Sequence, residues 1–290
     1  MKVPEQGLDF PNPSRFRVII GISASAVLSK TDRLDELLRR DVTHVEAGFF
    51  ENIEIADTFV KNARQRGKSV GIHSPLIQVG SKYDLLESVD MPSEDAWHQV
   101  EEEAKWCRGR GVQYLLVHFP YAPQSGTLTN EVVRSGLRRL ATIQSRYGVS
   151  IVCEPKLGDD LNLGAIDWIK TAPPRMFSES NLKLCWDVGD HLLANGNEAR
   201  YLEEYRRWRK SIQVVHLHNV RREGRLYRWT PPHPNKSLVD SDHDLRPIIS
   251  ELADGMIVVA EYTPQPVASP QNVDATFHYL NEHAKEDKVA

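Results

Sequence analysis

Short apolar runs and longer amphipathic stretches alternate along the chain. Eight of the apolar runs are rich in valine, isoleucine and leucine, a composition typical of strands that are buried on both faces. These predicted strands are residues 18–23, 42–48, 69–73, 114–118, 150–154, 183–187, 213–218 and 256–262. We therefore expect strands that lie inside the protein and are covered by the segments between them.

The stretches between the strands carry apolar residues at helical spacing, most clearly at Leu245, Ile248, Ile249 and Leu252. Repeated alternation of strand and helix predicts an α/β fold, and eight such units predict a (β/α)8 TIM barrel. A doubly wound open sheet is the alternative. That fold normally has a glycine-rich turn after its first strand, and residues 21–25 contain only one glycine.

The 290 residues are enough for one barrel, so we predict a single domain over 1–290, with 1–16 as an N-terminal extension and 285–290 as a C-terminal tail. No run approaches the roughly 18 apolar residues of a membrane-spanning helix, and residues 1–16 lack the apolar region of a signal peptide. Three cysteines without metal-binding spacing argue against a disulfide framework. These features predict a cytoplasmic protein with no membrane partner. The net charge of −4 argues against nucleic acid as the main partner.

Four of the apolar runs in the second half of the chain end in a residue that can bind a metal ion. These residues are Glu154, Asp187, His216 and Glu261. A charged group at the end of a buried strand is costly unless something compensates it, and one divalent cation on the barrel axis could compensate all four. Three carboxylates and one imidazole suit Mn²⁺, Mg²⁺, Co²⁺ or Zn²⁺, so we predict one such ion as a cofactor.

Other predicted strands also end in polar groups that would face the same end of the barrel, namely Glu46, His73, His118 and His218. Each alone carries little weight. Glu46 could be a salt-bridge partner, and His118 could be a hydrogen-bonded pocket residue. Because active sites of TIM barrels lie at the carboxyl ends of the strands, the concentration of such groups there predicts an enzyme.

The order of these residues resembles the xylose isomerase-like barrel superfamily. The segments that carry the resemblance are Cys-Glu-Pro-Lys at 153–156, Trp-Asp-Val-Gly-Asp-His at 186–191, His-Leu-His-Asn at 216–219 and Ala-Glu-Tyr at 260–262, together with His73 and His118. The superfamily contains sugar isomerases and epimerases as well as the endonuclease IV type of abasic-site nucleases. The resemblance covers nearly the whole chain.

The resemblance implies that Glu154, Asp187, His216 and Glu261 bind the metal ion. It also implies that Glu154 and Glu261 are the catalytic pair, in which one carboxylate takes a proton from the carbon next to a carbonyl and the other returns it. The implied intermediate is an enediolate.

The remaining site residues are expected to contact the substrate. They are His73, His118, His191, Arg222, Glu46, His218 and Trp229. His73 and His118 could instead occupy a further metal position, and His218 could have a supporting role beside the ligand His216. Arg222 lies in a run of charged residues that could simply be solvated. Trp229 could stack on a sugar ring or pack against its own loop.

The chain departs from the superfamily pattern after the sixth strand. The usual Asp-x-x-His after the sixth strand is replaced by Asp187-Val-Gly-Asp190-His191. Either Asp190 takes the place of the histidine, or a bulged turn still lets His191 reach inward. The nuclease branch also carries Asp-x-His after the seventh strand. No such motif occurs between residues 219 and 239, a stretch that we expect to be a loop.

These features together predict a divalent-metal-dependent isomerase or epimerase that acts on a small carbohydrate or a sugar derivative. An endonuclease IV-like abasic-site nuclease is one alternative, although the net acidic charge does not favour phosphodiester binding. A metal-dependent dehydratase of the same barrel is another, since it would use the same metal and bases. The sequence is also compatible with a homo-oligomer.

Overall fold

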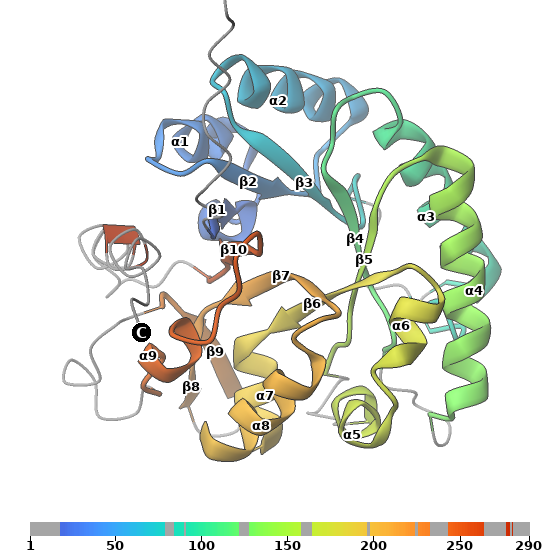
Figure 1. The fold of residues 1–290 in the computed structure, drawn as a ribbon. Coiled ribbons are helices and arrows are strands. Elements are labelled where there is room, and N and C mark those ends of the chain that lie inside the picture. Colours follow the sequence, from blue (N-terminus) through green and yellow to red (C-terminus); the bar gives the residue numbers. More distant parts are fainter. Residues whose placement is uncertain are drawn as a thin grey trace, which may run out of the picture.

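A computed structural model describes residues 18–78, 84–89, 91–121, 128–157, 164–195, 198–223, 226–232, 243–263, 277–278 and 280. The predicted N-terminal extension at 1–16 and the predicted tail at 285–290 lie outside these residues. Within them, the strands and helices follow the alternation that the sequence predicts (Figure 1).

Eight parallel strands close into a barrel in the order β1-β10-β7-β6-β5-β4-β3-β2. This confirms the predicted TIM barrel. The barrel strands are β1 (Ile19–Ser23), β2 (His44–Ala47), β3 (Ser69–His73), β4 (Tyr114–His118), β5 (Ile151–Glu154), β6 (Lys183–Asp187), β7 (Ile212–Leu217) and β10 (Ile257–Ala260). Each observed strand lies within a predicted one or extends one residue beyond it. The agreement arises because the strands are buried on both faces and therefore read as continuous apolar runs.

Helices surround the barrel. They are α1 (Leu34–Arg39), α2 (Ile53–Gln65), α3 (Ser93–Cys107), α4 (Asn130–Tyr147), α5 (Gly164–Thr171), α6 (Arg175–Glu179), α7 (Val188–Asn195), α8 (Glu198–Trp208) and α9 (Arg246–Ile249), with short 3₁₀ turns at Ala24–Val27 and Thr31–Arg33. The apolar face of α2 is buried against the sheet. Its first turn is capped by Asn52, whose side chain accepts a hydrogen bond from the amide of Ile55 at 3.0 Å. None of the helices in the described parts of the chain combines the length and apolar character needed to cross a membrane.

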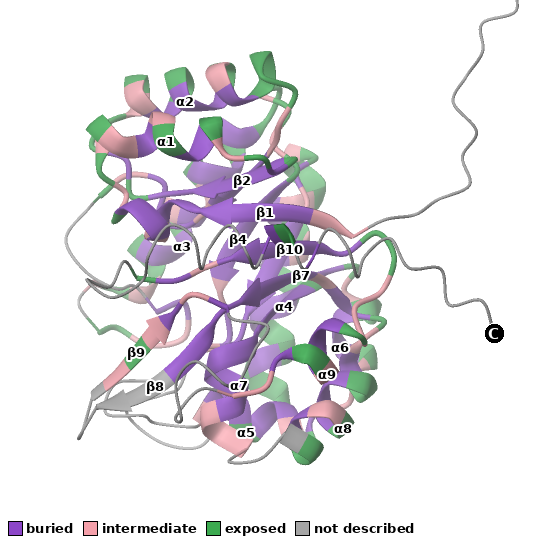
Figure 2. Ribbon diagram, turned by 90° about the vertical axis from the view of Figure 1, so that its left-hand side faces the viewer, coloured by how far each residue is buried: buried purple, intermediate pink, exposed green. Residues whose placement is uncertain are grey.

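A two-stranded antiparallel hairpin follows the seventh barrel strand. Its strands are β8 (Asn219–Glu223) and β9 (Leu226–Thr230). It projects from the end of the molecule at which the barrel strands terminate (Figure 2). The expectation that 219–239 is a loop is therefore wrong for this first part, and residues 233–239 lie outside the described residues.

The buried side chains form two groups. The larger one fills the space between the strands and the surrounding helices. The smaller one lies inside the barrel and consists of Tyr114, Leu116, Val152, Cys185, Val214, Ile257 and Val259. The inner group fixes which residues face the barrel axis and hence which side chains reach its carboxyl-terminal mouth.

Candidate metal centre and active site

The two-residue period of a strand directs the last residue of several barrel strands into the mouth. Glu154 lies two positions after the inward-facing Val152, and Asp187 lies two positions after Cys185. His216 and Glu261 follow Val214 and Val259 in the same way. Because alternate side chains of a strand share a face, these four groups stand directly above the apolar layer of the barrel.

The four side chains converge on one point. One ligand atom from each of Glu154, Asp187, His216 and Glu261 lies within 4.8 Å of the others. His216 Nδ1 is 3.2 Å from Glu154 Oε1 and 2.7 Å from Glu261 Oε2. Oxygen donors with a single imidazole form a donor set that suits divalent Mn, Mg, Co or Zn. These residues could therefore hold one such ion.

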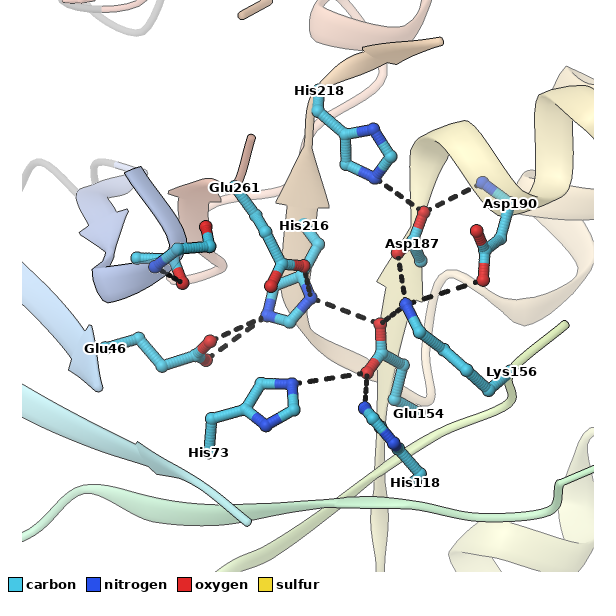
Figure 3. A network of polar contacts seen from close by, with 12 residues as sticks. Glu46, His73, His118, Glu154, Lys156, Asp187, Asp190, His216, His218 and Glu261 are labelled. Atoms are coloured by element: carbon cyan, nitrogen blue, oxygen red, sulfur yellow. Dashed lines mark hydrogen bonds and ion pairs between the residues drawn. The ribbon is translucent and has the colours of Figure 1, made fainter. Parts of the chain in front are cut away.

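Lys156 lies among the same carboxylates. Its Nζ is 3.0 Å from Glu154 Oε1, 2.9 Å from Asp187 Oδ2 and 3.4 Å from Asp190 Oδ2 (Figure 3). Two residues after Glu154, it follows Pro155 at the end of β5 and turns back over the barrel mouth. The sequence analysis quoted this lysine in Cys-Glu-Pro-Lys but gave it no role.

His73 and His118 approach Glu154 from the opposite side. Their Nε2 atoms are 3.7 Å and 3.2 Å from Glu154 Oε2. The three residues offer ligand atoms within 4.8 Å of one another and could hold a second cation that shares Glu154. This position agrees with both expected roles of the two histidines, which were substrate contact or a further metal site.

Asp187 is held from behind by His218. His218 Nε2 donates to Asp187 Oδ1 at 2.8 Å, and the amide of Asp190 donates to the same oxygen at 2.8 Å. Gly189 makes room for this imidazole, because a Cβ at that position would lie 2.1 Å from the His218 ring. His218 therefore supports Asp187.

Asp190, and not His191, occupies the place of the histidine in the superfamily motif. The backbone after Asp187 enters α7 directly, so Asp190 faces Lys156. His191 stacks on Trp186, with ring centroids 3.6 Å apart, on the helical side of the sheet. His191 therefore lies away from the mouth in which a substrate contact was expected, and Trp186 is a core residue.

Burial and charge act against each other on the carboxylates. Burial alone would raise the pKa of Glu261, but the positive charges of His216 and Lys156 outweigh it and lower that pKa to about 2. Burial likewise opposes ionisation of Glu154, and Lys156 and His216 hold its pKa well below the usual range. Asp190 shows the reverse, since burial and the nearby charge of Asp187 raise its pKa to about 6.

Only part of the cluster can be reached from the mouth. The side chains of Glu261, His118, Lys156 and His73 are 18%, 22%, 20% and 13% exposed, whereas those of Glu154, Asp187, His216 and Glu46 are fully buried. A ligand that enters the mouth would meet the first group, and a small ion could lie beneath it.

Three other residues expected to contact the substrate, Trp229, Arg222 and Glu46, differ in where they lie. Trp229 lies on the hairpin with its ring 6.1 Å from that of His218, beside the mouth. Arg222 belongs to β8, but its side chain is outside the described residues. Glu46 is fully buried at the floor of the mouth, where Tyr114 donates to it at 2.7 Å and His216 Nε2 lies 3.0 Å away. One of its oxygens lies within 4.8 Å of ligand atoms of His73 and Glu261, so these three residues could also hold a cation.

Lys156, Tyr114 and His44 are the polar residues that the sequence analysis missed. Lys156 had a signal, because it is two residues from a predicted ligand and could compensate the same carboxylates as the predicted metal ion. Tyr114 and His44 lie at the amino-terminal ends of β4 and β2. Neither residue was predicted, because the predicted site was built from the carboxyl ends of the strands.

Comparisons with known proteins agree with the fold. Residues 39–283 match the family described as the xylose isomerase-like TIM barrel. No curated protein sequence gives a significant match. Among solved structures, 3-keto-D-glucoside 4-epimerase from E. coli superposes with a TM-score of 0.61 at 15% sequence identity, covering 92% of this chain and 100% of the epimerase.

Two further solved structures, with different descriptions, share this fold. AP endonuclease, family 2, from Brucella melitensis has a TM-score of 0.60 at 14% identity, covering 91% of this chain and 98% of its own. A xylose isomerase-like TIM barrel protein from Mycobacterium smegmatis, in complex with magnesium, has a TM-score of 0.57 at 12% identity, covering 93% and 96%. Identities this low establish a common fold and leave the reaction open.

Proposed function

Because the chain belongs to the xylose isomerase-like TIM barrel family, we propose that it is a divalent-metal-dependent isomerase or epimerase of a sugar or sugar derivative. The observation that carries this proposal is the convergence of Glu154, Asp187, His216 and Glu261 at the barrel mouth. The similarity to 3-keto-D-glucoside 4-epimerase supports it at the level of fold.

We propose Glu154, Asp187, His216 and Glu261 as the ligands of one divalent ion. When bound, such an ion would polarise the substrate carbonyl and stabilise the negative charge that develops on its oxygen. The three carboxylates supply the negative charge that a divalent cation needs, and His218 orients Asp187 from behind. Mn²⁺, Mg²⁺, Co²⁺ and Zn²⁺ all fit this donor set.

Glu261 and Glu154 are the proposed acid–base pair. Both are ionised at neutral pH, because nearby positive charges lower the pKa of each carboxyl group, so either can accept a proton. Glu261 is the more accessible of the two, and we assign it the first proton abstraction from the carbon next to the carbonyl. Glu154 would deliver a proton that it takes from the Lys156 ammonium group, 3.0 Å from its Oε1, while solvent takes the proton from Glu261 and reprotonates Lys156. His73, His118 and Lys156 line the approach and can donate hydrogen bonds to sugar hydroxyls.

A solvent-exchange experiment tests this proposal. The full chain is freed of metal, loaded with Mn²⁺ or Mg²⁺, and incubated in D₂O with a panel of ketoses and 3-keto sugars. Proton transfer through an enediolate predicts deuterium on the carbon next to the carbonyl and a new isomer. Glu154→Gln and Glu261→Gln should each lower turnover at least about 100-fold, whereas the exposed control Glu179→Gln should not change it.

Retention of more than a tenth of the activity in either active-site variant would contradict the two-base mechanism. Loss of water from the substrate without formation of an isomer would identify a dehydratase instead.

A second candidate function is cleavage of DNA at abasic sites, which one specific observation favours. His73 and His118 place a second cation position next to the first, with Glu154 shared between them. Pairs of metal ions commonly act in phosphodiester hydrolysis. An abasic-site duplex incubated with the zinc-loaded chain tests this candidate. Cleavage by the parent chain that is lost in His118→Ala would establish the nuclease. A duplex that stays intact with the parent chain would favour the isomerase.

A further inference from the structure

A continuous row of polar side chains runs through the barrel interior. His44 Nδ1 is 2.8 Å from Ser69 Oγ, and His44 Nε2 is 3.0 Å from the Tyr114 hydroxyl. That hydroxyl donates to Glu46 Oε2 at 2.7 Å, and His216 Nε2 lies 3.2 Å from the same oxygen and 3.0 Å from Oε1. The row begins at the first residues of β2 and β3 and ends at the mouth, where Glu46 meets His216 from the side opposite to Lys156 (Figure 3).

The backbone is shaped to admit this row. TIM barrel interiors are usually filled by branched aliphatic side chains, but here His44, Tyr114, Glu46 and His216 are fully buried in that space. Gly71 on β3 provides room for the tyrosine, because a Cβ at that position would lie 2.3 Å from its ring. The rings of His44 and Tyr114 stack with centroids 5.5 Å apart.

The donors and acceptors of the row have one consistent direction. The Tyr114 proton is committed to the carboxylate of Glu46, so the tyrosine oxygen must accept from His44 Nε2–H. Burial lowers the pKa of His44 to about 4, which leaves this imidazole neutral with a single N–H. His44 Nδ1 must then accept from the Ser69 hydroxyl, which lies 2.8 Å from it and 3.3 Å from the competing Thr43 carbonyl. The Tyr114 hydroxyl thus donates to the Glu46 carboxylate from the side that faces away from the mouth.

The position of Glu46 determines which nitrogen of His216 keeps its proton when a metal ion displaces the other. A carboxylate that faces Nε2 accepts the proton of that nitrogen, and Nδ1 is then the atom that points toward Glu154 and Glu261. Partners of this kind commonly fix the tautomer and ring orientation of metal-binding histidines. We infer that Glu46, held in place by Tyr114 and His44, is a positioning residue that presents His216 Nδ1 to the metal ion.

This inference rests on the proposed metal centre and replaces the expectation that Glu46 contacts the substrate. It concerns the affinity for the metal ion and the protonation of His216, and neither measurement requires a sugar substrate. Failure of the proposed reaction would therefore leave it standing if the chain binds metal as described.

Mn²⁺ binding to the full-length, metal-free chain is measured by isothermal titration calorimetry for a series of variants. Glu46→Met removes the acceptor and should weaken binding about 10- to 100-fold. Glu46→Gln should weaken it less, because its amide oxygen can still accept from Nε2–H. Tyr114→Phe removes one supporting hydrogen bond and should weaken it about two- to tenfold.

Tyr205→Phe is the matched control. It removes an equally buried hydroxyl that contacts the Glu251 carbonyl and the Met256 sulfur, outside the row. It should lower thermal stability in the same way as Tyr114→Phe and leave the Mn²⁺ affinity unchanged. ¹⁵N NMR of the Zn²⁺-loaded chain should show His216 bound through Nδ1 and protonated at Nε2.

Three results would overturn the inference. The first is equal Mn²⁺ affinity of Tyr114→Phe, Glu46→Gln and the parent chain. The second is zinc bound to His216 through Nε2. The third is failure of the parent chain to bind Mn²⁺ or Zn²⁺ at all. If Glu46→Met does not fold, the Mn²⁺ affinities of Tyr114→Phe and Glu46→Gln still test the inference.

Discussion

At the scale of single residues, Lys156 decides the charge balance of the site. Burial alone would lower the pKa of this lysine, but Asp187, Asp190 and Glu154 raise it well above the usual value. Its ammonium group is therefore the fixed cation that allows three carboxylates to lie together in a buried cluster. A divalent ion bound by Glu154 and Asp187 would also compensate the negative charge of these carboxylates.

Replacement of Lys156 by methionine should consequently destabilise the metal-free chain. Removing one partner of a buried ion pair leaves the other charge uncompensated, and we expect a loss of about 3 kcal/mol in the free energy of unfolding. Added Mn²⁺ should raise the melting temperature of the variant more than that of the parent. Lys105→Met, which removes an exposed pair with Glu102, should cost less than about 1 kcal/mol. Equal losses in the two variants would show that Lys156 has no special role.

His44 gives a pH dependence whose sign can be derived. Burial lowers its pKa to about 4 in the folded chain, against about 6.5 when unfolded. Between these values the unfolded chain binds the extra proton. The contribution of His44 to stability is therefore present above about pH 6.5 and is lost as the pH falls through about 4.

Denaturant unfolding of the metal-free parent and of His44→Gln at several pH values measures this contribution. The difference between their free energies of unfolding should shrink by up to about 3 kcal/mol between pH 7 and pH 4. The other histidines are common to both proteins and cancel in the difference. A difference that stays constant over this range would show that His44 is not held neutral.

At the scale of secondary structure, the barrel strands could be predicted because each is a continuous apolar run, as in Leu184-Cys185-Trp186. The hairpin could not be found by the same rule. Its strands alternate Val220, Tyr227 and Trp229 with arginines, and such a pattern belongs to strands with one face in solvent. This two-residue alternation is the sequence signal that indicates the hairpin. The hairpin matters for function because it carries Trp229 to the barrel mouth.

Trp229→Ala should therefore act on substrate binding and leave the metal centre intact. The indole ring contacts His218, which supports Asp187 from outside the proposed ligand set. We expect a higher KM for the sugar identified in the solvent-exchange screen, with kcat and Mn²⁺ affinity within about threefold of the parent. Arg228→Ala, whose position in the register faces the other side of the hairpin, is the control. An unchanged KM would assign Trp229 to loop packing alone.

At the scale of the whole molecule, the fold and the convergence of Glu154, Asp187, His216 and Glu261 follow from one fact. Parallel strands in a closed barrel bring their carboxyl ends to a single mouth, so residues far apart in the sequence become neighbours. Sequence alone cannot show what lies beneath that mouth. The contact of Glu46 with His216, the turn of Lys156 back over the strands and the outward rotation of His191 depend on side-chain packing in three dimensions.

The same geometry explains why the family accommodates different reactions. The buried groups that we propose as ligands form the floor of the site, while the more exposed His73 and His118 and the hairpin form its rim. Substrate choice is expected to depend on the rim, where His73, His118 and Trp229 lie, and metal binding on the floor.

The central claim is that the buried cluster at the barrel mouth is a divalent-metal centre. Its most direct test is the stoichiometry and affinity of Mn²⁺ binding by equilibrium dialysis, for the parent chain, Glu154→Gln and Asp187→Asn. We predict about one tightly bound ion per chain, with affinity at least about tenfold weaker in both variants. No bound metal in the parent, or binding that neither substitution changes, would contradict the account.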